Sequence, residues 1–486
     1  MSRKRGRQPN RILENIRIEK AAAEGNSLAH VDGKVLFVSY SAPGDLADVE
    51  VIRSKAGYMQ GRIAALKEES PLRCAPFCEH FGLCGGCKWQ HLLYQEQLKQ
   101  KQAQVRDNLE RIGKIELPEG LPILGSEQNR AYRNKLEFTF SVKRWLTENE
   151  ISENQTLDEA SRQGLGFHLA GKFDKVLDLN HCFLQAETSN EIRLFIKKNA
   201  IALGLDFYDI RAQKGFMRNL MIRNTPKGEY MVVVVIGSEP TAAFNTLMER
   251  ICEAFPCITC LMYAVNTKVN DSMGDLDIRL FKGEPFITMT MPAYGQNEPE
   301  LKFRVGPKSF YQTNSGQAAR LYRLTADLAA IKPDQTVYDL YTGTGTIANY
   351  VARSAAKVVG IEYVEDAVRD ARINSELNGI SNTSFFAGDM AAVFTPGFVR
   401  EHGIPDVVIT DPPREGMHEK VVECLMNDAI FQGKLSRIVY VSCNSATQAR
   451  DLQRMAEKYK VVNHAAVDMF PHTDHVESVV LLERRA

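Results

Sequence analysis

Two side chains near the end of the chain could carry out covalent chemistry. Cys443 follows an apolar segment, Arg437–Ser442, that predicts a buried strand, and ligands of open α/β sheets bind at the carboxyl ends of the strands. A thiolate nucleophile at that edge needs a nearby base to complete its reaction. Glu477, at the start of the final apolar run, is our choice for this base. The polar stretch before it offers three further candidates, His472, Asp474 and His475.

A glycine loop predicts a cofactor site. The apolar strand at residues 337–340 leads into G-x-G-x-x-A from Gly343, which matches the dinucleotide fingerprint. The loop alone does not distinguish NAD from S-adenosylmethionine. Glu362 ends the next strand at the roughly 20-residue spacing of a ribose-binding carboxylate, which can accept from both ribose hydroxyls. Asp389 follows the third strand, where an acid would contact adenine.

The loop after the fourth predicted strand narrows the chemistry. Asp406–Thr410 is followed by Asp-Pro-Pro-Arg, from Asp411 to Arg414. Methyltransferases of exocyclic amines resemble this motif but carry an aromatic residue where this chain has Arg414, which cannot stack on an amine in the same way. Cytosine-C5 RNA methyltransferases carry a cysteine in this loop, and none is present here. The nucleophile must therefore come from another element, and Cys443 on the next strand supplies one.

A thiol and a base of this kind suit methylation of uracil at C5. That carbon is a weak nucleophile, but a thiolate that adds to C6 gives C5 enolate character, so that it can take a methyl group from a sulfonium donor. The adduct keeps a proton on C5, which a base must remove before the thiol can leave. These roles are predicted for Cys443 and Glu477.

Three cysteines in C-x5-C-G-G-C predict a metal centre: Cys78, Cys84 and Cys87. The glycines allow tight folding and point backbone amides at sulfur, and thiolates at short spacing suit either zinc or an iron–sulfur cluster. A fourth ligand must come from elsewhere. Cys182 is the best candidate, and a structural zinc that uses Cys74 or His80 is the main alternative.

A second cysteine pattern, C-x4-C-x2-C, resembles the spacing of plant-type iron–sulfur proteins. Its members are Cys252, Cys257 and Cys260. The surrounding residues have strand character and include no glycine. We therefore predict that these cysteines are buried small hydrophobic residues and not ligands.

Over nearly its whole length the chain resembles the RNA uracil-C5 methyltransferases that carry an iron–sulfur cluster. The most specific motifs are the C-x5-C-G-G-C loop, the Asp411 loop, Val441–Asn444 and Met469–Glu477. The resemblance implies Cys443 as nucleophile and Glu477 as proton acceptor. It also implies a [4Fe-4S] cluster on four cysteines, Cys78, Cys84, Cys87 and Cys182.

The resemblance also nominates contacts to S-adenosylmethionine. Phe310-Tyr-Gln-Thr-Asn resembles the family segment whose glutamine contacts the cofactor, which nominates Gln312. The remaining cofactor and substrate contacts would come from Tyr341, Gly343, Glu362, Asp389 and Asp411. The loop departs from the family pattern Asp-Leu-Phe-Cys-Gly-x-Gly-Asn at three positions, Tyr341, Thr342 and Thr346. Tyrosine keeps the aromatic face, whereas Thr346 is shorter than asparagine.

Composition sets the wider limits. The 486 residues carry 60 Lys+Arg and 60 Asp+Glu, which excludes a uniformly basic nucleic-acid coat but allows local basic patches. The longest apolar run, Met231–Gly237, is too short for the roughly 20 residues of a membrane span, and the basic N-terminus has no apolar core behind it, unlike a secretory signal. We expect a cytoplasmic monomer without membrane contact. Its cysteines are then expected to serve as metal ligands or catalysts and not to form disulfides.

The predicted fold class is α/β, in three parts that follow a tail. The basic tail covers residues 1–11, and the three parts are a TRAM-like, OB-like β-barrel at 12–70, an α+β iron–sulfur central domain at 71–300 and a Rossmann-like methyltransferase domain at 301–486. The expected partner is RNA, and by analogy with the family we prefer 23S rRNA over tRNA. The target uridine must be flipped out of its stack to be modified. Two rivals are a non-catalytic RNA-binding protein and a nicotinamide-dependent oxidoreductase.

Overall fold

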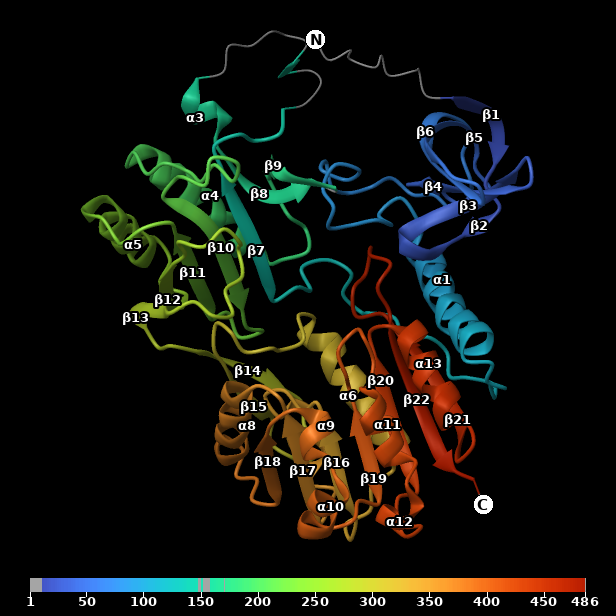
Figure 1. Cartoon of the computed structure of the whole chain (residues 1–486). Helices are drawn as coiled ribbons and strands as arrows, with labels where there is room; N and C mark the ends of the chain where they lie inside the picture. Colours follow the sequence, from blue (N-terminus) through green and yellow to red (C-terminus); the bar gives the residue numbers. More distant parts are fainter. Residues whose placement is uncertain (1–10, 147–149, 152–157, 170, 486) are drawn as a thin grey trace, which may run out of the picture. The chain divides into compact units, whose positions relative to one another are not determined.

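A computed structural model describes residues 11–146, 150–151, 158–169 and 171–485 (Figure 1). The predicted basic tail, apart from Arg11, lies outside these residues. The chain forms two compact units: Met1–Gln104 with Phe470–His475, and Val105–Met469 with Val476–Ala486. In the described part of the chain, every helix is too short or too polar to cross a membrane.

The first unit contains a six-stranded sheet in the order β1-β5-β6-β4-β3-β2. Its strands are β1 (Ile12–Arg17), β2 (Lys20–Ala21), β3 (Asn26–Val31), β4 (Lys34–Ser39), β5 (Leu46–Ser54) and β6 (Tyr58–Glu68). An Asp-Gly turn joins β3 to β4, and Asp32 and Gly33 both have positive φ, 50° and 74°, as a mirror-image hairpin turn requires. Leu36, Val38 and Val49 are fully buried and form the centre of the core.

A late segment of the chain, Phe470–His475, belongs to this first unit. The His472 carbonyl accepts from the backbone amides of Lys88 and Trp89 at 2.9 and 3.0 Å, and the His472 amide donates to Gln97 Oε1 at 2.9 Å. Asp474 forms an ion pair with Lys88 at 3.4 Å. These bonds fix His472 and Asp474, two of the alternative bases, within the first unit.

Helix α1 (Tyr94–Asp107) continues as a π-helical turn, η2 (Asn108–Ile112). The second unit then builds a sheet in the order β13-β12-β11-β10-β7-β8-β9. Its strands are β7 (Lys135–Ser141), β8 (Gly164–Leu169), β9 (Lys172–Asp178), β10 (Met217–Asn224), β11 (Tyr230–Ile236), β12 (Ile258–Val265) and β13 (Ile278–Gly283), with helices α3 (Glu159–Arg162), α4 (Glu187–Ala202) and α5 (Ala242–Ala254). Every residue of β11 is buried, in keeping with its continuous apolar run.

The second cysteine group is only partly as predicted. Cys260 is buried in β12, but Cys252 and Cys257 are half-buried. The expectation that all three are buried is therefore wrong for two of them. Cys252 lies in the last turn of α5 and Cys257 in the connection to β12, so both lie outside the buried strand that holds Cys260.

A two-stranded hairpin, β14 (Ile287–Met291) and β15 (Leu301–Val305), follows this sheet, and the predicted boundary at 300/301 falls inside it. The last sheet has the order β18-β17-β16-β19-β20-β22-β21 (Figure 1). Its strands are β16 (Thr336–Leu340), β17 (Lys357–Glu362), β18 (Thr383–Ala387), β19 (Val407–Thr410), β20 (Arg437–Ser442), β21 (Tyr459–Val467) and β22 (Glu477–Arg484). This confirms the predicted doubly wound α/β sheet.

Eight helices connect the strands of this region: α6 (Ser315–Ala329), α7 (Thr346–Ala352), α8 (Glu365–Leu377), α9 (Met390–Val393), α10 (Pro396–His402), α11 (Glu419–Leu425), α12 (Asp428–Phe431) and α13 (Ser445–Met455). From β16 the chain moves outward through β17 to β18, then returns to β19 on the other side of β16. Ligands of open α/β sheets bind at such a switch point. The cofactor edge is therefore expected at the carboxyl ends of β16 and β19.

Candidate active site

The strand register brings Cys443 and Glu477 together. β20 and β22 pair antiparallel, with Ser442 opposite Ser478. Cys443 directly follows Ser442 and Glu477 directly precedes Ser478, so the next facing positions of the two strands are the thiol and the carboxyl group. β20 is parallel to β19, which is parallel to β16, so this pair lies at the cofactor edge of the sheet.

Glu477 is a buried acid with an elevated pKa. Glu477 is only 5% exposed. Burial raises the pKa of Glu477, the neighbouring Asp411 carboxylate raises it further, and the Arg414 guanidinium lowers it. Asp411 follows the end of β19, and burial together with Asp339 raises the pKa of Asp411 as well. The structure therefore groups Glu477 and Asp411, both predicted site residues.

Cys443 faces the same groups. Burial, and then the charges of Glu477 and Asp411, raise the pKa of the Cys443 thiol to about 11. The neighbouring Arg414 guanidinium lowers that pKa. The sequence placed Arg414 in the loop after the fourth predicted strand but gave no sign of this contact, since Arg414 and Cys443 belong to different strand-end loops.

The loop that carries Arg414 is fixed to helix α13. The Arg414 carbonyl accepts from Asn444 Nδ2 at 3.0 Å, and the Met417 amide donates to Asp451 Oδ2 at 2.8 Å. The Tyr440 hydroxyl donates to the same Asp451 oxygen at 2.8 Å. Asn444 also follows the thiol directly in sequence. The Asp411–Met417 loop and the Cys443 loop are therefore held as one rigid piece.

The glycine loop is shaped around Glu362. Gly343 and Gly345 have φ of 56° and 76°, and a Cβ on Gly345 would approach the Ala371 Cβ to 2.9 Å, so glycine is required there. Glu362 Oε2 accepts from the Gly343 amide and Oε1 from the Val364 amide, each at 3.0 Å. The carboxylate is thus anchored beside the loop, at the place predicted for a ribose contact.

Two threonines explain how the unusual loop sequence is accommodated. Thr342 Oγ1 donates to Asp339 Oδ2 at 2.5 Å, and the same oxygen accepts from the Ala348 amide at 3.0 Å. Burial raises the pKa of Asp339, which is fully buried. Thr346 Oγ1 hydrogen-bonds to the Tyr322 hydroxyl at 3.3 Å. The sequence did not single out Asp339, although an acid on an apolar strand before a glycine loop was a usable signal.

The other predicted cofactor contacts lie around this loop. Gln312 is buried, and its segment reaches the loop through a bond from Thr344 Oγ1 to the Phe310 carbonyl at 3.3 Å. Tyr341 directly follows β16, with φ of 64°. Asp389 is exposed, and its carboxylate accepts from the Ala392 amide at 3.1 Å, capping helix α9.

The first three predicted cluster ligands lie in a tight loop of the first unit. Cys78 and Cys84 are half-buried and Cys87 is buried. The Gly86 amide donates to Cys84 Sγ at 3.4 Å. Charges on Cys84 and Cys87 contribute, after burial, to raising the pKa of Tyr40, so both sulfurs lie close to that hydroxyl.

The fourth ligand is a separate question. Cys74 donates its thiol to the Gln90 carbonyl at 3.3 Å, which weakens the zinc alternative that used it. Cys182 belongs to the second unit, where Asn190 Oδ1 accepts from its amide at 2.9 Å. Across residues 11–146, 150–151, 158–169 and 171–485, no group of three or more histidine, cysteine, aspartate or glutamate side chains is arranged to hold a metal ion. The cluster ligands therefore stay a prediction.

Two sequence families match parts of the chain. Residues 13–64 match the TRAM domain, and residues 281–485 match the family described as tRNA (Uracil-5-)-methyltransferase. These ranges cover most of the first sheet and the α/β sheet that contains Glu477 and whose strand β20 ends next to Cys443.

Whole-chain similarity extends further. A Porphyromonas gingivalis protein described as an uncharacterized RNA methyltransferase is 53% identical over 96% of this chain and 99% of its own. A Bacteroides thetaiotaomicron protein of the same description is 50% identical over 96% of this chain and 100% of its own. The crystal structure of Pyrococcus abyssi tRNA (uracil-54, C5)-methyltransferase in complex with S-adenosyl-L-homocysteine is similar with a TM-score of 0.71, at 27% identity, over 97% of this chain and 100% of that one.

The fold and its site define an α/β methyltransferase with an N-terminal TRAM domain. More closely, the chain belongs to the TRAM-containing RNA uracil-C5 methyltransferases, enzymes that use S-adenosylmethionine. The nicotinamide-dependent interpretation of the glycine loop is thereby excluded.

Proposed function

We propose that this enzyme methylates C5 of a uridine in ribosomal RNA, with Cys443 as nucleophile and Glu477 as base. The observation that supports these roles best is the antiparallel register that pairs Ser442 with Ser478, the residues next to Cys443 and Glu477. The predicted cofactor residues suit S-adenosylmethionine, because Glu362 is anchored beside the glycine loop through the Gly343 amide. When bound there, the cofactor supplies an electrophilic methyl group on sulfur.

The reaction begins with the thiol. Its pKa of about 11 in the substrate-free site means that the thiolate must form as uracil binds. Arg414 stabilises that thiolate, while Glu477 and Asp411 carry less negative charge at neutral pH because their pKa values are raised. Sulfur then adds to C6, and the electrons of the C5–C6 double bond become available at C5 for bond formation to the methyl carbon.

Glu477 completes the cycle. After methyl transfer, C5 still carries its proton, which the ionised Glu477 carboxylate removes as a general base. The electrons of the C5–H bond restore the C5–C6 double bond and expel the Cys443 thiolate. Burial of Glu477 suits this task, since a raised pKa makes the carboxylate a stronger base than an exposed glutamate.

Two substitutions test these roles separately. Cys443→Ala should abolish both methylation and any covalent RNA adduct. Glu477→Gln should accumulate a protein–RNA adduct that survives denaturing electrophoresis, because addition and methyl transfer proceed but elimination does not. Persisting methylation without an adduct in Glu477→Gln would remove this residue from the role of base.

We also propose an iron–sulfur cluster held by Cys78, Cys84, Cys87 and, as the sequence predicts, Cys182. The local donor set suits it, since thiols are the ligands of such clusters and the Gly86 amide already points at Cys84 sulfur. The cluster would shape an RNA-binding surface, and no step of the methylation runs through it.

Ribosomal RNA is the proposed substrate because the cysteine loop resembles the iron–sulfur members of the family. Transfer RNA is the second candidate, since the similar Pyrococcus abyssi enzyme acts on uracil-54 of tRNA. Mass-spectrometric mapping of 5-methyluridine in both RNAs from a deletion strain decides between them. Loss from tRNA alone would overturn the ribosomal proposal and leave the chemistry intact.

A further inference from the structure

The segment at residues 306–314 connects β15 to α6 without regular secondary structure. It carries Gln312, the proposed cofactor contact, so the inference that follows rests on the proposed function. Within the segment the Gly306 carbonyl accepts from the Ser309 amide at 3.3 Å, and buried carbonyls without such a partner need donors from neighbouring elements. The residues that supply these donors therefore help to set the position of Gln312.

Arg223, at the end of β10, supplies one set of donors. Its Nη1 and Nη2 both donate to the Ser309 carbonyl at 3.1 Å, and Nη1 also reaches the Gly306 carbonyl at 3.4 Å. The residue is only 2% exposed, and burial lowers the pKa of its guanidinium to about 10. Burying a guanidinium is costly, so its use on backbone carbonyls points to a positional role.

Asn134, just before β7, supplies the second set. Its Nδ2 donates to the Gln312 carbonyl and to Ser315 Oγ, both at 2.8 Å. Its backbone amide donates to the Thr313 carbonyl at 2.7 Å. The Asn134 carbonyl in turn accepts from the amide of Asn224, the neighbour of Arg223, at 2.9 Å. Two adjacent strand ends of the central sheet thus hold the segment by four of its carbonyls.

The other side of the segment contacts the methyltransferase sheet. The Phe310 carbonyl accepts from Thr344 Oγ1 in the glycine loop at 3.3 Å, and Ser309 Oγ donates to Asp370 Oδ2 on α8 at 2.7 Å. The Met469 carbonyl accepts from Asn314 Nδ2 at 3.1 Å. The segment therefore spans the distance between the central sheet and the cofactor loop.

We propose that Arg223 is a positioning residue for cofactor binding, and that Asn134 assists it. By holding residues 306–313 against the end of the central sheet, the two side chains set the position of Gln312 relative to the glycine loop. The central domain then contributes to the affinity for S-adenosylmethionine without touching the cofactor.

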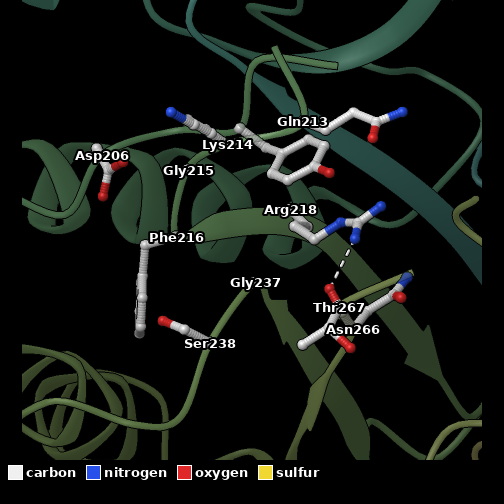
Figure 2. A pocket seen from close by; sticks show the side chains of 11 residues that line it. Asp206, Gln213, Lys214, Gly215, Phe216, Arg218, Gly237, Ser238, Asn266 and Thr267 are labelled. Carbon is white, nitrogen blue, oxygen red and sulfur yellow. Dashed lines mark hydrogen bonds between the residues drawn. The ribbon is translucent and has the colours of Figure 1, made fainter. Parts of the chain in front are cut away.

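The same strand offers a matched control. Arg218, at the other end of β10, is 1% exposed and likewise donates to loop carbonyls, those of Asn266 and Lys268, at 2.6 Å each. It lines a separate polar cavity of about 390 Å³, together with Gln213 and Ser238 (Figure 2). None of the predicted site residues lines this cavity. Arg218→Met therefore measures the general cost of losing a buried guanidinium on this strand.

The experiment compares Arg223→Met, Arg223→Lys and Arg218→Met in the full-length enzyme. Arg223→Met should raise the KM and Kd for S-adenosylmethionine about tenfold, the loss expected for charge-assisted hydrogen bonds, with kcat at saturating cofactor and RNA affinity unchanged. Arg223→Lys should lie between, because one ammonium cannot match the forked guanidinium. Arg218→Met should lower Tm about as much as Arg223→Met does, and it should leave the KM for S-adenosylmethionine unchanged. Asn134→Ala should repeat the KM effect, and it replaces Arg223→Met if that variant does not fold.

An unchanged cofactor KM in Arg223→Met, or an equal rise in Arg218→Met, would overturn the inference. Gln312→Ala separates this failure from failure of the proposed function. If Gln312→Ala leaves cofactor affinity unchanged, the role of Gln312 is wrong. If Gln312→Ala weakens binding and Arg223→Met does not, only the positioning role of Arg223 is wrong.

Discussion

Replacing Glu477 by glutamine should change the acidity of Cys443, the proposed nucleophile, as well as remove the proposed base. The Glu477 charge is one of the causes that raise the pKa of Cys443 to about 11, after burial. Glutamine keeps the size and shape of the buried side chain but carries no charge. The thiol pKa should therefore fall in Glu477→Gln, because a neighbouring negative charge disfavours the thiolate.

The size of the effect follows from the register. Directly facing side chains of an antiparallel pair have Cβ atoms about 5 Å apart, so a separation of about 6 Å between sulfur and carboxylate is a fair working value. At an effective dielectric constant of about 20, two unit charges at that distance interact by about 3 kcal/mol, or about two pKa units. Cys443 is half-buried, and solvent screening reduces this to a fall of about one unit.

The assay is the pH dependence of alkylation. Iodoacetamide reacts with the thiolate, and mass spectrometry of the peptide that contains Cys443 separates this thiol from the other cysteines. Glu483→Gln, at the far end of the same strand β22, is the matched control and should leave the midpoint unchanged. An unchanged midpoint in Glu477→Gln, or an equal fall in Glu483→Gln, would refute the electrostatic coupling of residues 443 and 477.

Three further predictions concern the rest of the enzyme. Burial and Asp411 raise the pKa of Glu477, so the ionised form that a base needs is lost as pH falls. The kcat/KM for RNA should therefore rise with pH through the neutral range. A flat profile between pH 6 and 9, roughly the range in which a buried carboxyl group titrates, would contradict the role of Glu477 as the base. Glu362→Ala should weaken S-adenosylmethionine binding about tenfold in calorimetry without changing RNA affinity, and unchanged cofactor binding would remove Glu362 from the site. Anaerobically purified Cys84→Ser should lose iron while Cys252→Ser keeps it, and zinc without iron in the wild-type protein would exclude the proposed cluster.

The order of elements in the α/β sheet was predictable because each strand leaves a strong local signal. A continuous apolar run followed by a glycine or an acid marks β16, β17 and β19 without knowledge of the partners. The same holds for β11, which is buried throughout. Local patterns of this kind survive folding because burial on both faces allows few polar residues.

Contacts between distant loops were not predictable. The Arg414 guanidinium acts on the Cys443 thiol from another strand end, and nothing in either loop specifies the other's side-chain direction. The same applies to Arg223, whose sequence neighbours suggest an ordinary strand residue, although its guanidinium holds the Ser309 carbonyl. Such contacts depend on how the sheets pack, which single-residue preferences do not encode.

The Phe470–His475 insertion limits how this enzyme can be re-engineered. The chain passes from one compact unit to the other after Gln104, after Met469 and after His475. A chain shortened to begin at Val105 would lose Lys88, Trp89 and Gln97, the partners of His472, just ahead of Glu477. The N-terminal unit therefore cannot be removed without losing the contacts that hold His472. If the N-terminal unit were replaced by that of a homologue, for example to direct the enzyme to another RNA, residues Phe470–His475 would have to be replaced by the homologue's segment at the same time.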